Sequence, residues 1–86
     1  MPEISRFFGI VIKMFYSDHA PPHFHAEYAG HEALIAIETL EVLRGVLPRR
    51  ALALVIEWAV THRGELRSEW ERARSGRTLV PIPPLE

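Results

Sequence analysis

Three of the five histidines lie close together in one short segment, "SDHAPPHFHAEY", residues 17–28. In an extended strand, residues i and i+2 project from the same face, so His23, His25 and Glu27 would share one side. His19 comes four residues before His23, across two prolines, and can fold back beside them. Imidazole and carboxylate groups are ligands that zinc and similar ions bind at ~2.0–2.2 Å. The spacing therefore predicts a divalent transition metal such as zinc, held by His19, His23, His25 and Glu27.

Three charged residues could complete such a site. Asp18 adjoins the cluster and is expected to accept a hydrogen bond from a ligating imidazole, which would fix the tautomer of that ring. Arg49 and Arg50 are adjacent at the start of an expected helix, where both could contact a phosphate or an acidic partner. A metal ion with an open position lowers the pKa of its bound water. These residues together are consistent with a metal-dependent hydrolase or nuclease.

The histidine segment also has two interpretations without a metal. Its imidazoles could be polar residues on the half-exposed face of a sheet, with Glu27 paired to an arginine of the basic second half. Alternatively, the histidine face could bind a partner with an affinity that changes at about pH 6–7. His31 is expected at the surface of a turn. His62 lies near the edge of a helical apolar stripe and is expected to be a packed or hydrogen-bonded residue.

The composition describes an ordinary globular chain of 86 residues, with 48% hydrophobic and 24% charged residues. This length corresponds to a single domain, residues 1–86, whose small core makes a protein partner or a homo-oligomer plausible. The absence of cysteine excludes a disulfide, a thiolate zinc site and a cysteine nucleophile. We find no secretion signal and no apolar run of ~20 residues. A cytoplasmic protein without a membrane partner is therefore expected.

Charge is distributed unevenly along the chain. The net charge is −1, which gives no general attraction to nucleic acid. Residues 1–41 carry a charge of −4, whereas residues 42–79 carry +4. All the basic residues except Lys13 are arginines, which favour bidentate contacts with carboxylate or phosphate. The two halves could equally attract each other within one fold.

The apolar pattern predicts an α+β fold. Antiparallel strands are expected in a meander of three to four strands with short connections. The expected strands cover about residues 7–16, 23–29, 32–38 and 41–44. One long C-terminal helix, about residues 48–74, should pack against this sheet. A proline-rich tail, residues 77–86, can add one short edge strand at most.

The expected helix has two unusual features. Its apolar residues stay on the same helical face before and after Gly64. A continuous or gently bent helix is therefore favoured over two helices. Yet ~40 Å of helix exceeds the ~30 Å diameter of a compact domain this size, so a bend near Gly64 is expected. Leu54 and Trp58 lie away from the main stripe. They must be covered by the tail, a second copy or another protein, and a partner interface is expected there.

Three segments of the chain, taken together, resemble a known protein family. They read "ISRFFGIVIKMFYSDHAPPHFHAEYAG", "LPRRALALVIEWAVTHRGEL" and "WERARSG". The chain resembles the bacterial domain-of-unknown-function family DUF4160, most distinctively in its D-H-x-P-P-H-F-H segment. The resemblance implies a small cytoplasmic protein, often encoded beside another small protein in pairs proposed as toxin–antitoxin-like modules. It implies no established activity, cofactor or catalytic residue. A protein-interaction component of such a pair is therefore the first expected function, and a metal-dependent hydrolase or nuclease is the alternative.

Overall fold

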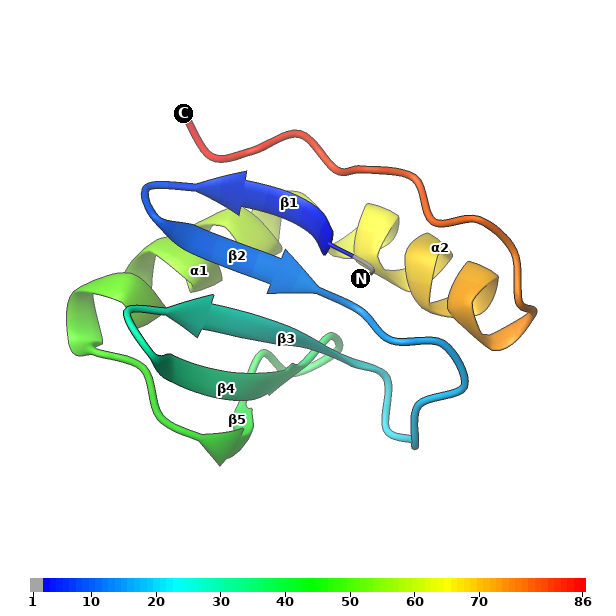
Figure 1. The fold of residues 1–86 in the computed structure, drawn as a ribbon, viewed down its shortest axis with the longest axis horizontal. Coiled ribbons are helices and arrows are strands. Elements are labelled where there is room, and N and C mark those ends of the chain that lie inside the picture. The colour runs from blue at the N-terminus through cyan, green and yellow to red at the C-terminus, as the bar shows by residue number, and fades with distance from the viewer. Residues whose placement is uncertain (1–2) are drawn as a thin grey trace.

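A computed structural model describes residues 3–86. Five strands form one antiparallel sheet in the order β1-β2-β3-β4-β5, and two helices follow them (Figure 1). The elements are β1 (Glu3–Phe7), β2 (Ile10–Lys13), β3 (His23–Tyr28), β4 (His31–Ala36), β5 (Val42–Gly45), α1 (Arg49–Thr61) and α2 (Arg63–Arg74). The α+β class and the antiparallel meander are confirmed, with more strands and helices than expected.

The first expected strand, residues 7–16, is in fact a hairpin. Phe8 and Gly9 form a two-residue turn with φ angles of 49° and 80°, and Phe7 pairs with Ile10 across it. Positive φ at both central positions matches the right-handed twist of the flanking strands. Phenylalanine rarely adopts this conformation. The apolar residues 7–16 were therefore predicted to form one strand, and the turn was missed.

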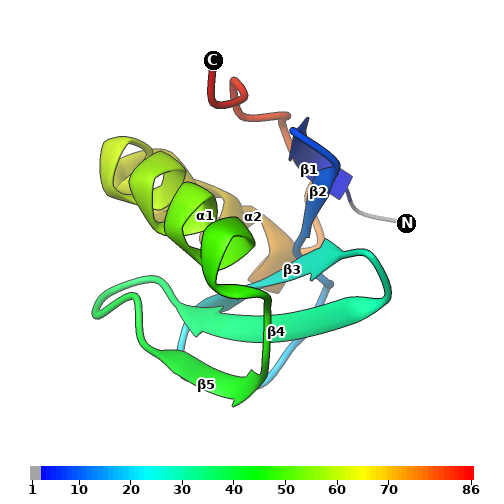
Figure 2. The same cartoon turned by 90° about the vertical axis from the view of Figure 1, so that its left-hand side faces the viewer.

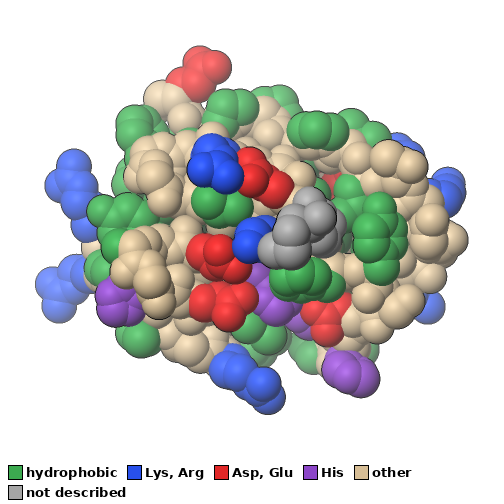
Figure 3. Space-filling model, in the orientation of Figure 1, with side chains coloured by type: hydrophobic (Ala, Val, Ile, Leu, Met, Phe, Trp, Pro, Cys, Tyr) green, Lys and Arg blue, Asp and Glu red, His purple; other side chains and the backbone are tan. Residues whose placement is uncertain are grey.

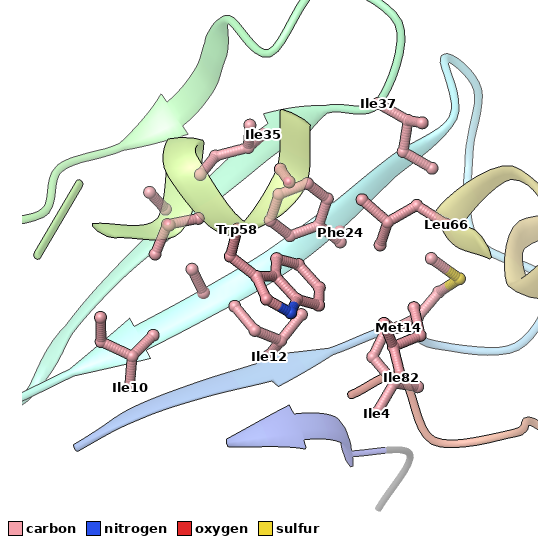
Figure 4. Packing of buried hydrophobic residues seen from close by; sticks show 14 of the residues in the cluster. Ile4, Ile10, Ile12, Met14, Phe24, Ile35, Ile37, Trp58, Leu66 and Ile82 are labelled. Carbon is pink, nitrogen blue, oxygen red and sulfur yellow. The ribbon is translucent and has the colours of Figure 1, made fainter. Parts of the chain in front are cut away.

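Both helices cover one face of the sheet (Figure 2). Because side chains alternate along a strand, Ile10 and Ile12 of β2 and Phe24 of β3 face the helices and are fully buried. Trp58 of α1 and Leu66 of α2 complete this core from the other side (Figure 4). The opposite face of the sheet carries Lys13 of β2 and Glu32 of β4, and the register places the histidines of β3 on the same side.

The expected single helix is interrupted at His62, whose φ and ψ are −113° and 22°. The break precedes Gly64, which lies exposed within α2. The apolar stripe nevertheless stays in phase, since Val55, Ala59 and Leu66 are all fully buried. Two shorter helices fit a molecule with extents of 33 × 25 × 23 Å, which a single straight helix would exceed. None of the helices within residues 3–86 has the length and apolarity needed to cross a membrane.

The tail forms no strand in residues 77–86. It runs past β1 (Figure 1), and beyond Arg77 three hydrogen bonds attach it to the rest of the fold. The Val80 N–H donates to Glu69 Oε1 at 2.7 Å. The Ile82 N–H donates to the Ile4 carbonyl at 2.7 Å. Trp58 Nε1 donates to the Pro83 carbonyl at 2.9 Å.

This tail corrects the expectation that Trp58 belongs to a partner interface. Its side chain is 0% exposed, because the sheet and the tail of the same chain cover it. Leu54, the other residue assigned to that interface, is half-buried and packs at the margin of the core.

An ion pair connects the end of the sheet to α2. Arg67 donates two hydrogen bonds to the carboxylate of Glu38, both at 2.7 Å. These bonds hold the pKa of the Glu38 carboxyl below its usual value and raise the pKa of Arg67. Both groups are exposed to solvent, so the pair contributes little to the stability of the fold.

Candidate metal centre

Asp18, His23 and His25 converge on one point at the start of β3. One potential ligand atom from each lies within 4.8 Å of the others. Asp18 Oδ2 is 3.0 Å from His23 Nε2 and 3.2 Å from His25 Nε2. Figure 3 shows histidine side chains gathered between acidic ones on this side of the molecule.

The second nitrogen of each ring faces a hydrogen-bond acceptor. His23 Nδ1 is 2.8 Å from the Pro21 carbonyl oxygen, and His25 Nδ1 is 3.0 Å from Glu32 Oε2. Carbonyl and ionised carboxylate oxygens only accept, which assigns a proton to Nδ1 of both rings. In the neutral rings, both Nε2 lone pairs then point toward the same carboxylate oxygen. A cation between these three atoms, either a proton or a metal ion, makes the arrangement favourable.

The loop that precedes β3 orients the carboxylate. The His19 backbone N–H donates to Asp18 Oδ1 at 2.8 Å, so the other oxygen, Oδ2, faces the imidazoles. Within this loop, the Pro21 carbonyl accepts the hydrogen bond from His23 Nδ1. The Pro22 carbonyl accepts from the Ile37 N–H at 3.0 Å and attaches the loop to the end of β4.

Two aromatic rings flank the histidines of the cluster. Trp70 of α2 lies 5.3 Å from the His23 ring, and Phe15 contacts the His25 ring edge-on at 4.6 Å. The side chains of His23 and Asp18 are 5% and 21% exposed. Burial alone would raise the pKa of Asp18, but the hydrogen bond from the His19 backbone N–H and the interactions with the His25 and His23 rings outweigh it and lower the pKa below its usual value. Asp18 is therefore an ionised carboxylate at neutral pH.

Two of the four expected ligands, His23 and His25, lie in this cluster, and the other two lie outside it. Glu27 Oε2 instead pairs with Lys13 Nζ at 3.0 Å. Glu27 shares a strand face with His23. It lies four positions further along the chain, however, which corresponds to about 13 Å in an extended strand. His19 presents only its backbone to Asp18, and its side chain is exposed. Asp18, expected as an outer acceptor, instead contributes one of the three converging atoms.

The acceptor that faces His25 Nδ1 is Glu32, which the sequence did not suggest. His25 pairs with Leu34 across β3 and β4, and Glu32 lies two residues from Leu34 on the same face. Such diagonal neighbours are within reach of long side chains. The strand register is therefore the signal that identifies Glu32, and register requires knowing how β3 and β4 pair.

The family model described as "Domain of unknown function (DUF4160)" matches residues 9–71. The chain belongs to the DUF4160 family. Searches of curated proteins and of solved structures found no match. The matched span includes Asp18, His23, His25 and Glu32, whereas the tail that covers Trp58 lies beyond it.

A pocket of about 250 Å³ opens beside the cluster in this DUF4160 protein. Its walls include Asp18 and His23, together with Leu34 of β4 and Leu43 and Arg44 of β5. Two of the three converging residues, Asp18 and His23, therefore border this pocket.

Arg49 and Arg50, the arginines expected to contact phosphate, are at the opposite end of the sheet, at the start of α1 (Figure 1). Arg50 lines a different pocket with Phe8 and Leu54. Arg44 is instead the arginine beside the cluster.

Proposed function

We propose that this DUF4160 protein binds a divalent transition metal ion such as zinc and uses it for hydrolysis. The ligands are Asp18 Oδ2, His23 Nε2 and His25 Nε2. One observation carries the proposal: both Nε2 atoms face the same carboxylate oxygen, while both Nδ1 atoms face outer acceptors. This is the arrangement in which a histidine ligand donates its other N–H to a carboxylate or a carbonyl.

The composition of the cluster favours a catalytic role over a structural one. Structural zinc sites use four protein ligands, whereas catalytic sites use three and leave one position for water. Within residues 3–86 only Asp18, His23 and His25 form such a group. An ion held by three ligands would activate water and polarise a substrate oxygen. The adjoining pocket gives a substrate access to that position.

Elemental analysis of the untagged protein tests this proposal. Protein loaded with zinc and then desalted should retain about one equivalent of the metal. His25→Ala should lose it, because two protein ligands hold zinc much more weakly than three. His31→Ala is the matched control, since His31 is an exposed histidine at the start of β4. Retention of zinc by His25→Ala, or no retention by the wild type, would contradict the proposal.

A second candidate function is favoured by the outer edge of the sheet. Strand β5 is the last of the sheet, and Val42, Leu43 and Val46 are 39%, 45% and 67% exposed. Unpaired edges with exposed apolar side chains pair readily with other chains. We propose that this edge contacts a small protein partner in the bacterial cytoplasm, in a toxin–antitoxin-like pair.

Co-expression with the product of the adjacent gene tests this second function. The two proteins should co-purify, and Val46→Lys should reduce the yield of the complex several-fold. Val60→Lys is the control, because Val60 is 57% exposed on α1, away from the edge. If the neighbouring protein fails to co-purify, or if both variants behave alike, the edge is not the interface.

A further inference from the structure

We infer that the substrate of the candidate metal centre carries a phosphate group and that Arg44 binds this group. The inference rests on the proposed metal-binding function and specifies its substrate class.

The strand register places Arg44 on the same face as the cluster. Lys13 pairs with His25, His25 with Leu34, and Leu34 with Arg44. Directly paired residues of antiparallel strands project from the same side of the sheet. These four side chains therefore form one row across β2, β3, β4 and β5. Arg44 also lines the pocket whose other walls include Asp18 and His23.

Arg44 differs from the other cations near this face because it has no acidic partner. Lys13, at the other end of the row, is paired with Glu27 at 3.0 Å. Arg67, at the adjoining end of the sheet, is paired with Glu38. Within residues 3–86, Arg44 forms no salt bridge, and it is exposed. An unpaired guanidinium in a pocket next to an ionised carboxylate and two imidazoles is available for an anionic ligand.

The chemistry of the guanidinium favours phosphate. Its planar group forms two parallel N–H···O bonds with phosphate oxygens. A phosphate ester in this pocket would place one oxygen toward the metal position and others toward Arg44. Leu34 and Leu43 provide an apolar wall for the ester group. In the reaction, water attacks phosphorus, the ester P–O bond breaks, and the departing oxygen takes a proton from the water. The products are inorganic phosphate and an alcohol.

Calorimetric titration of the zinc-loaded protein with inorganic phosphate tests the inference. The wild type should bind phosphate, and Arg44→Gln should weaken this binding roughly tenfold or more, as expected for charge-assisted hydrogen bonds. Arg44→Gln should still retain about one equivalent of zinc. Arg50→Gln is the control and should change neither quantity, because Arg50 lines a different pocket. A parallel titration with acetate should show much weaker binding than phosphate.

The outcomes separate the two proposals. Normal zinc content without phosphate binding, equal binding by Arg44→Gln, or equal binding of acetate would overturn the phosphate inference alone. Loss of zinc from the wild type would overturn the proposed function, and the inference with it.

Discussion

Replacing Trp58 with alanine is expected to lower the free energy of unfolding by about 3–5 kcal/mol, the range for large aromatic residues in cores. Trp58 is fully buried. Its ring lies 5.4 Å from that of Phe7 and 5.9 Å from that of Phe24. The substitution would leave a large cavity between α1 and the sheet. It would also remove the hydrogen bond from Trp58 Nε1 to the Pro83 carbonyl, and this bond anchors the tail.

A loss of this size is a large part of the total stability. Domains of this length typically have about 4–13 kcal/mol, so the variant should be partly unfolded at 37 °C. Urea denaturation measures the difference. Val60→Ala is the matched control on the same helix, because Val60 is 57% exposed and should change the stability by less than about 0.5 kcal/mol. If Trp58→Ala cost less than about 1 kcal/mol, the ring would not be part of the core, and a role in an interface would be favoured.

Zinc at about 100 times its dissociation constant is expected to raise the melting temperature by roughly 10–20 °C. Binding to the folded state alone adds about 2.7 kcal/mol at that concentration. In domains of 60–100 residues, each kcal/mol corresponds to about 4–8 °C. The size of this stabilisation is set by the ratio of the zinc concentration to the dissociation constant.

Asp18→Ala should remove most of this thermal shift. Asp18 Oδ2 is the atom that both imidazoles share, so its loss leaves two neutral ligands and weakens binding strongly. Glu57→Ala is the control, because Glu57 is an exposed carboxylate on α1. Differential scanning calorimetry with and without zinc gives the comparison. An absent shift in the wild type, or an equal shift in Asp18→Ala, would show that zinc does not bind at this cluster.

The sequence by itself determined the α+β class, the antiparallel order and the approximate positions of β3, β4 and β5. These features follow from local periodicity. Alternation from His23 to Tyr28 indicates a strand with two different faces, and the helical stripe indicates which residues of α1 and α2 are buried. The same alternation placed His23 and His25 on one face, as the structure has them.

Only the tertiary structure decided which residues join the histidines. Asp18 reaches them because the proline loop folds back, whereas Glu27 remains about 13 Å along the strand from His23. Glu32 and Arg44 depend on how β3, β4 and β5 align. Trp58 is covered in part by the tail, which it contacts through the carbonyl of Pro83, 25 residues further along the chain. Contacts between distant segments are set by packing and strand register, which local sequence patterns do not specify.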